Sequence, residues 1–492
     1  MKSRARQVIL PVLVFALSAF SGVTQDKITD SFALRSPAGV TGRTLPGKES
    51  GEGQISVILG RPSDHTVTAS VLSAEAMEGF CEYGVAPGNY SKKTGVVALA
   101  SGKPVDFVLG PLPVDTACVY RLRYRKLGES VFTEGGMHSF HTQRAPGKAF
   151  VFEIQGDSHP ERPKQHDSSL YSKTLKAAAA DHPDFYMCIG DDFSVDTLHV
   201  VNEGTVVQRY LLQRPFLALV AQSAPLFLVN GNHEQASACN LDGTSNNVAV
   251  WAQNARNTYF PQPAPDGFYT GDTKPVPFIG LLRDYYAWTW GDALFVVIDP
   301  YWHSTKPVDN PFGGGEKSKD LWSVTLGADQ YKWFSQTLKS SHAKFKFVFS
   351  HHVLGTGRGG IENASLGEWG GENRKGVNEF GRMRPDWEMP IHQLMATNGV
   401  TIFFQGHDHV FARQSLDGVV YQTLPEPADP SYTLYFKEAF RSGNILPNSG
   451  RVRVTVTPDK VTVEYIRSWL QIDVTDLHTD GEVAFRYCIM TK

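Results

Sequence analysis

Five short polar motifs occur in a fixed order along the 492-residue chain, and their side chains could bind metal ions. They are Asp157-Ser158-His159, Gly190-Asp191, Gly231-Asn232-His233-Glu234, His351-His352 and Gly406-His407-Asp408-His409. Asp157 and Asp191 supply two carboxylates, Asn232 supplies an amide, and the histidines supply a set of imidazoles. All of these are ligands of divalent transition metals. A single Gly-Asp or His-His pair arises by chance in a chain of this length. The complete ordered set offers enough oxygen and nitrogen for two adjacent ions.

A short apolar run ends directly at each motif. The runs are 150–154, 185–189, 226–229, 345–349 and 401–404. Their apolar and β-branched residues predict strands of a buried sheet. The motifs then lie on loops at strand ends, where a rigid sheet can hold ligands from distant parts of the chain on one rim.

Segments with helical spacing separate these strands. They are 171–180, 203–221 and 328–338, and Pro215 is expected to break or kink the second. Strands that alternate with helices indicate an α/β layered domain. Two alternating runs, 451–456 and 461–465, flank a turn and predict a hairpin that completes a sheet of this domain.

Residues 53–145 have a different sequence pattern. Short β-rich runs such as 55–59, 66–71 and 118–122 recur between turns rich in Gly and Pro. Several short strands in under a hundred residues predict a small all-β sandwich. The catalytic chemistry then belongs to 149–492, which carries all five motifs.

The N-terminus has the layout of a signal peptide. Lys2, Arg4 and Arg6 precede an apolar stretch at 8–20, and small residues follow near Ser21. This stretch is short for a membrane span. We therefore expect a signal peptide at 1–21, export to the periplasm or the medium, and no transmembrane helix after cleavage. Residues 22–52, rich in Gly, Ser and Thr, predict a flexible segment.

The bulk composition excludes several classes of partner and site. The net charge is -3, with 41% hydrophobic and 20% charged residues, so nothing indicates binding to nucleic acid or to an anionic membrane. The five cysteines form no CxxC pair, which excludes a zinc finger and a dense disulfide framework. Cys81 and Cys118 could pair or remain buried thiols. The oligomeric state is not predicted.

The ordered motifs resemble those of the calcineurin-like metallophosphoesterase family. With the preceding sandwich, which resembles a fibronectin type III-like domain, the chain is similar to the purple-acid-phosphatase branch. The resemblance implies a metallophosphoesterase β-sandwich flanked by helices. It also implies a phosphate-ester substrate and two divalent transition-metal ions, which could be Mn, Fe, Zn or Ni.

The family pattern implies a role for each motif residue. Asp191 would bridge the two ions and hold the hydroxide that attacks phosphorus. The other metal ligands would be Asp157, His159 and His409 for the first ion, and Asn232, His351 and His407 for the second. His233 would be catalytic, by donating a proton to the leaving oxygen or by stabilising the transition state, and Asp192 or Asp196 could orient it.

Two further residues are candidates for substrate binding. His352 could bind substrate or hydrogen-bond to its neighbours. Arg358 could contact a phosphate, because guanidinium binds such oxygens in a bidentate way, or it could be a solvated arginine. It lies in 355–386, which is predicted to be a long functional loop. In and after this loop, Trp369 and Trp387 could contact an organic group or pack internally.

One departure from the purple-acid-phosphatase branch affects the expected spectrum. Ser194 stands where that branch has a tyrosine that binds iron, and His159 replaces the lost ligand. A tyrosinate-to-iron colour band is therefore not expected, whereas the two-metal reaction is.

The leading hypothesis is an exported two-metal phosphoesterase, with a phosphomonoesterase favoured by the domain arrangement. The alternative is a phosphodiesterase of nucleotide or phospholipid-type diesters. A third hypothesis is a non-catalytic cell-surface binding protein. It is disfavoured because no ligand of the set is missing.

Overall fold

The computed structural model of the protein describes residues 55–309, 311–314, 317–354 and 357–491. The predicted signal peptide (1–21) and flexible segment (22–52) lie outside these residues. In the part of the chain that is described, no helix has the length and apolar character needed to cross a bilayer.

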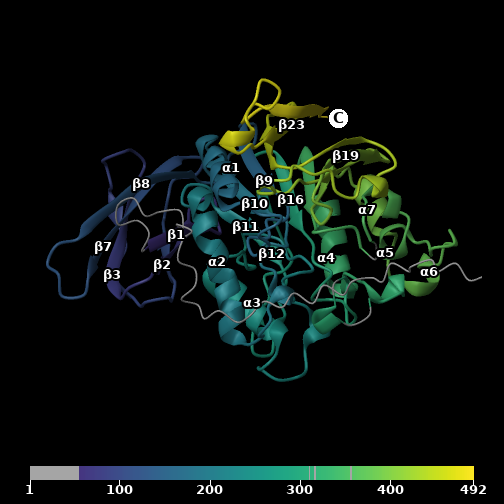
Figure 1. Ribbon diagram of the computed structural model, residues 1–492, viewed down its shortest axis with the longest axis horizontal. Helices are drawn as coiled ribbons and strands as arrows, with labels where there is room; N and C mark the ends of the chain where they lie inside the picture. Colours follow the sequence, from purple (N-terminus) through teal and green to yellow (C-terminus); the bar gives the residue numbers. More distant parts are fainter. Residues whose placement is uncertain (1–54, 310, 315–316, 355–356, 492) are drawn as a thin grey trace, which may run out of the picture. The chain divides into compact units, whose positions relative to one another are not determined.

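Two β-sheets form the centre of the region that carries the motifs (Figure 1). The first sheet contains β9 (Phe150–Gln155), β10 (Phe185–Cys188), β11 (Leu226–Leu228), β22 (Gly450–Val456), β23 (Lys460–Arg467) and β24 (Val483–Met490). The second contains β12 (Thr270–Gly271), β15 (Tyr286–Trp290), β16 (Ala293–Val297), β17 (Phe345–Phe349), β18 (Ile402–Gln405), β19 (Phe411–Leu416), β20 (Val419–Thr423) and β21 (Asn444–Leu446). A separate hairpin joins β13 (Pro275–Val276) to β14 (Gly280–Leu281). All five strands predicted before the motifs are confirmed.

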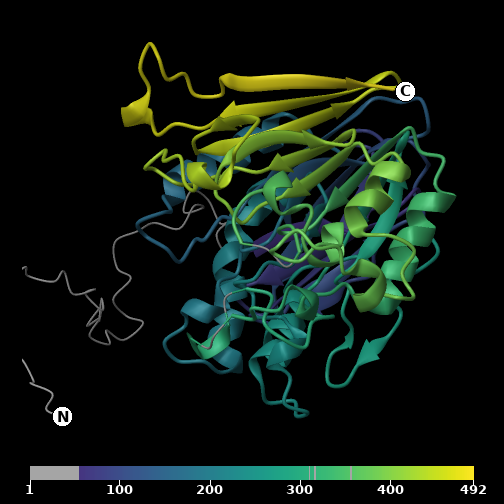
Figure 2. The ribbon, with the colours of Figure 1, turned by 90° about the vertical axis from the view of Figure 1, so that its right-hand side faces the viewer.

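The strand order explains how the sheets are built from distant parts of the chain. The first sheet runs β11-β10-β9-β22-β23-β24, and the second runs β12-β15-β16-β17-β18-β20-β19-β21. The predicted C-terminal hairpin is confirmed as β22 and β23, and β22 pairs antiparallel with β9. Figure 2 shows these C-terminal strands, in yellow, running beside the green strands of the second sheet.

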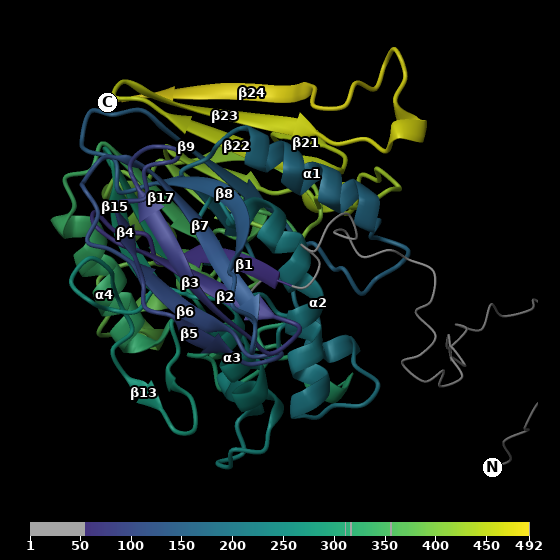
Figure 3. The same cartoon turned by 90° about the vertical axis from the view of Figure 1, so that its left-hand side faces the viewer.

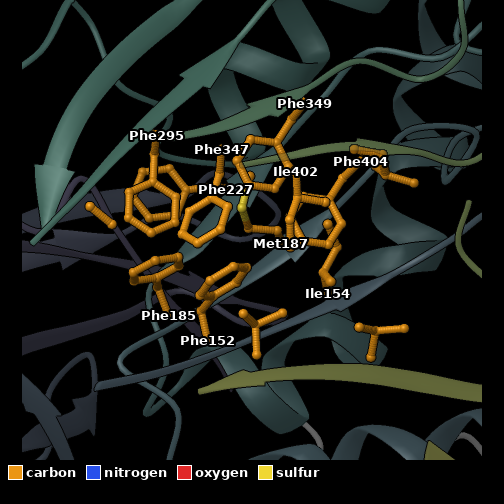
Figure 4. Close-up of a cluster of buried hydrophobic side chains, with 14 of the residues drawn as sticks. Phe152, Ile154, Phe185, Met187, Phe227, Phe295, Phe347, Phe349, Ile402 and Phe404 are labelled. Atoms are coloured by element: carbon orange, nitrogen blue, oxygen red, sulfur yellow. The ribbon is translucent and has the colours of Figure 1, made fainter. Parts of the chain in front are cut away.

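An aromatic core joins the two sheets. Phe152 and Phe185 of the first sheet face Phe295, Phe347 and Phe349 of the second (Figure 4). The Phe152 and Phe295 rings meet edge to face, with centroids 5.3 Å apart. Closely packed rings of this kind oppose movement of one sheet relative to the other. The strand ends of the two sheets therefore keep a fixed relative position.

Helices cover the outer face of each sheet. They are α1 (Ser168–Ala180), α2 (Glu203–Ala221) and α3 (Val248–Tyr259) on the first sheet, and α4 (Gly327–Ser340), α5 (Gly367–Gly370), α6 (Phe380–Met383) and α7 (Ile391–Thr397) on the second. The layers are therefore helix, sheet, sheet and helix. This arrangement confirms the predicted α/β class, a β-sandwich flanked by helices. The helices predicted at 171–180, 203–221 and 328–338 correspond to α1, α2 and α4.

Two predictions about local structure need correction. The predicted break at Pro215 is wrong, because helix α2 continues through this residue, whereas a kink there stays a prediction. The buried face of α2, which includes Phe216 and Leu217, packs on the first sheet. The free energy gained by this burial exceeds the cost of the one backbone hydrogen bond that proline removes. The segment 355–386 is not a plain loop, because its described part contains α5 and α6 and buries Trp369 completely.

An all-β region precedes the two-sheet region in the chain (Figure 3). Its strands are β1 (Ile55–Gly60), β2 (Val67–Ser73), β3 (Met77–Gly84), β4 (Lys92–Lys93), β5 (Val97–Leu99), β6 (Val105–Leu109), β7 (Ala117–Lys126) and β8 (Thr133–His141). They form a β1-β2-β6 sheet and a β4-β3-β7-β8 sheet in which β5 also pairs with β3. Cys81 and Cys118 are buried in its core as free thiols. The limits at 53–145 and 149–492, and the likeness to fibronectin type III, stay predictions.

Candidate metal centre

The loops that carry the motifs leave neighbouring parallel strands. β9, β10 and β11 are parallel neighbours, and so are β16, β17 and β18. Because the carboxyl ends of parallel strands meet at one edge of a sheet, each sheet delivers its loops to a common place. Asp157, Asp191 and Asn232 follow strands of the first sheet, and His351 and His407 follow strands of the second.

Asp157, His159 and His409 form a first group of buried ligand atoms. One such atom from each residue lies within 4.8 Å of the others. Asp157 Oδ2 is 3.1 Å from His409 Nε2 and 3.9 Å from His159 Nε2. One carboxylate and two imidazoles at this spacing can share a single cation.

Asp191, His351 and His407 form a second buried group. Asp191 Oδ2 is 2.9 Å from His351 Nε2, and His407 Nδ1 is 3.0 Å from Asn232 Oδ1. Asp191 also offers an oxygen within 4.8 Å of a ring nitrogen of His159. Its carboxylate therefore borders both groups, which is the position a ligand shared by two ions must occupy.

Both histidines of the first group direct their other nitrogen to an acceptor. His159 Nδ1 is 2.9 Å from Ser194 Oγ, and His409 Nδ1 is 3.3 Å from Glu426 Oε2. Histidines that bind metals almost always have such a partner, because it fixes the tautomer and the direction of the ring. In both residues the nitrogen that faces Asp157 is thus the one available to a cation.

The second group follows the same rule. His351 Nδ1 donates to the backbone carbonyl of Ile189 at 2.9 Å, and His407 Nε2 lies 3.3 Å from Asp309 Oδ2. His351 therefore turns Nε2 towards Asp191, whereas His407 turns Nδ1 towards Asn232. The loops that carry these histidines therefore direct one ring nitrogen of each residue towards the same buried centre.

Polar atoms inside the groups lack hydrogen bonds from the protein. Among the described residues, Asp157 Oδ2, His159 Nε2 and His351 Nε2 are buried and make none. Buried polar atoms are rarely left unsatisfied, so a cluster of them calls for an ion or water. The donors present therefore fit a pair of divalent metal ions.

Charge at the site also favours cations. Burial opposes ionisation of Asp191, but the imidazoles of His351 and His233 hold the pKa of this carboxyl well below its usual range. Burial likewise opposes the charged form of His351, yet Asp191 and Asp157 raise the pKa of that imidazole to about 10. The carboxylates stay ionised and attract positive charge, which a metal supplies as it displaces the imidazole proton.

His233 lies at the rim of the centre. Its Nδ1 is 2.9 Å from a carboxylate oxygen of Asp196, and its Nε2 is 3.7 Å from Asp191 Oδ2. Of the two proposed orienting residues, Asp196 therefore makes the contact. Asp192 instead accepts a hydrogen bond from Ser158 Oγ, beneath the first group. Arg162, which the sequence did not single out, places Nη2 3.0 Å from His233 Nε2.

The two residues predicted to bind substrate both lie beside the second group. The His352 ring is 4.8 Å from that of His407, and its two nitrogens have no hydrogen-bond partner among the described residues. Arg358 donates to the backbone carbonyl of His407 and stacks on Phe436, with 3.8 Å between the guanidinium carbon and the ring centroid. Arg358 is thus anchored to the protein, while 37% of its side chain stays exposed to solvent.

The two tryptophans near the long loop do not face the centre. Trp369 and Trp387 belong to the core between the second sheet and its helices, and Trp369 Nε1 donates to Tyr421 Oη at 2.8 Å. Of the two alternatives, internal packing is what the structure shows.

Comparisons with known proteins agree with this geometry. The model of the calcineurin-like phosphoesterase family matches residues 154–411. The solved purple acid phosphatase PPD1 from yellow lupin (Lupinus luteus) seeds has a TM-score of 0.57 at 16% identity, covering 88% of this chain and 74% of its own. The solved structure of PhoD has a TM-score of 0.57 at 14% identity, covering 84% of this chain and 86% of its own. The comparison with curated proteins found no significant match.

The two structural likenesses show a shared fold, and the family match extends over more than half of the chain. Its matched residues include all five motifs, whose side chains converge on one buried centre. The chain therefore belongs to the calcineurin-like phosphoesterase family and is a metal-dependent phosphoester hydrolase.

Proposed function

We propose that this hydrolase removes phosphate from phosphomonoesters. The observation that carries the proposal is the pair of buried ligand groups on either side of Asp191. The likeness to a purple acid phosphatase over 88% of this chain supports a monoesterase over a diesterase. A non-catalytic binding protein has no support, because the proposed ligands converge.

Seven side chains would hold the metal ions. The first ion would take Asp157, His159 and His409, the second would take Asn232, His351 and His407, and Asp191 would serve both. When bound, such ions supply Lewis acidity to phosphoryl oxygens and lower the pKa of water. Imidazole and carboxylate donors suit Mn, Fe, Zn or Ni.

Residues outside the ligand set would handle the substrate. His233 would donate a proton to the leaving oxygen, and Asp196 would keep its ring in the correct orientation. Arg162 lies next to this ring and can contact a phosphoryl oxygen, since guanidinium forms strong charge-assisted hydrogen bonds. His352 and Arg358 both contact His407 of the second ligand group.

A phosphodiesterase of nucleotide or phospholipid-type diesters is the second candidate. One observation bears on it: a small hollow that is partly open to solvent adjoins Asn232. We call it the Asn232 recess. Its lining includes Gly231, Asn232, Gln235, Ser237, Cys239, Tyr301 and Asp309. A second ester substituent would need room of this kind beside the metals.

The test compares p-nitrophenyl phosphate with bis-p-nitrophenyl phosphate. Metal-stripped protein would be refilled with Mn, Zn or Fe and assayed on both esters. Asp191→Ala should abolish turnover, because it removes the shared ligand. The matched control is Asp284→Ala, which removes an equally buried carboxylate that contacts His303 away from the centre.

Faster monoester turnover that disappears only in the Asp191 variant supports the phosphatase. Faster diester turnover moves the assignment to a phosphodiesterase. Protein that binds two metals and hydrolyses neither has a narrow natural substrate. Protein that binds no metal contradicts the catalytic proposal.

We also propose that the protein is exported, with cleavage near Ser21. The support is the positive and then apolar order of residues 2–20. Mass spectrometry of the mature N-terminus, after expression in a bacterium that secretes to the periplasm, tests this. A protein that retains Met1 and stays in the cytoplasm would contradict it.

A further inference from the structure

Arg162 places a guanidinium at the edge of the metal centre. Its Nη2 lies 3.1 Å from His233 Nδ1 and 3.0 Å from His233 Nε2. His233 forms a group with Asp191 and His159, in which one ligand atom of each residue lies within 4.8 Å of the others. A single imidazole ring therefore separates the positive charge of Arg162 from the carboxylate that would serve both ions.

The backbone of Arg162 is fixed by the turn that follows the first motif. Its N–H donates to the His159 carbonyl at 3.0 Å, and its own carbonyl accepts from the Gln165 N–H at 2.9 Å. Arg162 thus follows a proposed metal ligand on a hydrogen-bonded turn. A cation that is already in place loses little entropy when it binds a ligand.

Glu161 connects Arg162 to the first ligand group. The Glu161 side chain is 5% exposed, and its Oε1 lies 3.4 Å from Arg162 Nε and 3.5 Å from His159 Nδ1. One buried carboxylate therefore contacts both a proposed metal ligand and the arginine. Because an ion pair shielded from water is stronger than an exposed one, Glu161 restrains the direction of the guanidinium.

The guanidinium retains hydrogen-bonding capacity for a ligand. Its contacts with Glu161 and Gln165 are 3.4 Å and 3.5 Å long, which exceeds the length of well-formed N–H···O hydrogen bonds. Arginine carries several N–H donors in a planar fork. The side chain is also 25% exposed, so a molecule that enters from solvent can contact it.

The charge of the phosphate distinguishes the two candidate classes of substrate. A phosphomonoester carries close to two negative charges at neutral pH, because its second pKa is about 6, whereas a diester lacks the second charge. A guanidinium binds phosphoryl oxygens with charge-assisted hydrogen bonds, often two in parallel. In a diester, a substituent occupies one of those oxygens. A cation beside the metal ions therefore favours the monoester.

We propose that Arg162, positioned by Glu161, binds a terminal phosphoryl oxygen and raises the rate on doubly charged monoesters relative to singly charged diesters. This inference rests on the proposed phosphoesterase function and assigns its selectivity to one side chain.

The experiment uses two esters with the same leaving group. We would measure kcat/KM for p-nitrophenyl phosphate and bis-p-nitrophenyl phosphate with the metal-loaded wild type, Arg162→Gln, Arg162→Lys and Arg209→Gln. Arg209 is the matched control, because this arginine of α2 donates to Thr197 Oγ1 at 3.2 Å, next to Asp196. Its replacement removes a neighbouring positive charge but leaves Arg162 in place.

Arg162→Gln should lower kcat/KM for the monoester by roughly ten- to a hundredfold and leave the diester within about threefold. Arg162→Lys should lie between Arg162→Gln and the wild type, because it keeps the charge but loses the planar fork. Arg209→Gln should leave the ratio of the two rates unchanged. An equal loss on both esters overturns the proposal, since Arg162 would then act through His233 on the shared leaving group. A lysine variant no better than the glutamine variant overturns recognition by charge.

Binding of inorganic phosphate provides a readout that needs no turnover. Each variant would first be shown to hold two metal ions and then be titrated with phosphate in a calorimeter. Arg162→Gln should weaken phosphate binding about ten- to a hundredfold, and Arg209→Gln should not. Unchanged affinity in Arg162→Gln overturns the role of Arg162.

Glu161→Gln tests the positioning role. It should shift the ratio of monoester to diester rates in the same direction as Arg162→Gln, but by less, and an unchanged ratio overturns the role of Glu161. A wild type that prefers the diester refutes the proposed monoesterase. The change in ratio between Arg162→Gln and the wild type still tests the present inference, so the two failures are distinguishable.

Discussion

Glu426 illustrates how single residues outside the motifs support the metal ligands. This buried carboxylate places Oε2 3.3 Å from His409 Nδ1. Glu426→Gln keeps the shape of the side chain but removes its negative charge. That charge orients the imidazole of His409 and makes it a more basic metal ligand. We expect the affinity for the first ion to fall about ten- to a hundredfold, measured by calorimetric titration of metal-stripped protein with Zn or Mn.

The control for this prediction is Glu368→Gln. Glu368 is equally buried, but its carboxylate pairs with Arg384 and also accepts from the Leu326 backbone N–H. This variant should retain both metal dissociation constants. If Glu426→Gln binds both ions as the wild type does, Glu426 does not support His409.

The role of His233 predicts a dependence on the leaving group. A proton donor matters most when the leaving oxygen is strongly basic, so His233→Asn should affect alkyl phosphates more than p-nitrophenyl phosphate. We expect kcat for methyl phosphate to fall about 10²–10⁴-fold, with a smaller loss on the aryl ester. Asp196→Asn should show the same trend, more weakly. Equal losses on both esters would contradict a proton-donating role.

The motif residues could be predicted from the sequence, because each motif directly follows an apolar run that forms a strand. Their supporting partners could not. Asp309 lies in a segment with no motif, and only the folded chain brings it to His407. Glu426 follows the apolar strand β20 and so had a weak signal of the same kind.

At the scale of elements, the residue propensities and the composition predicted whether a segment is a helix, a strand or a loop. They did not predict how the segment packs against the rest of the protein. From Pro215 we predicted a break or a kink in α2, and the buried face of the helix prevents the break. The Gly-rich composition around Trp369 predicted a loop, yet the large indole is buried and organises that segment. Tertiary burial decided both cases, and local sequence does not report it.

Strand β8 carries a histidine that should make the N-terminal β-region sensitive to acid. Burial lowers the pKa of His138 to about 4, and its ring lies 5.5 Å from that of Tyr120. Between pH 6.5 and about 4 the unfolded chain binds a proton that the folded chain does not. Stability should therefore fall as the pH drops through this window, by up to about 3 kcal/mol.

His138→Gln removes this titration, so the variant should lose less stability than the wild type between pH 7 and pH 4.5. The measurement is the free energy of urea unfolding at several pH values. His65→Gln is the control, since His65 is an exposed histidine of the same region and its loss should leave the wild-type slope. Identical slopes for His138→Gln and the wild type would contradict the prediction.

At the scale of the whole molecule, one buried arginine connects the N-terminal β-region to the catalytic layers. Arg214 of α2 donates from Nε to Ser56 Oγ at 3.0 Å and from Nη2 to the Ser70 carbonyl at 2.7 Å. Its Nη1 donates to the carbonyl of Tyr259 at the end of α3. Burial lowers the pKa of Arg214 to about 10, so the group stays charged at neutral pH.

Arg214→Met should therefore weaken the attachment of the β-region. The variant leaves buried carbonyls without a donor, and we expect a loss of about 3–5 kcal/mol in the free energy of unfolding. Limited proteolysis should then cut within 142–149, between the two regions, faster than in the wild type. Arg209→Met, on the same helix, removes a hydrogen bond to Thr197, which does not belong to the β-region. This variant should change the free energy of unfolding and the rate of proteolysis little. If the Arg214 variant stays as protected as the Arg209 variant, other contacts hold the two regions together.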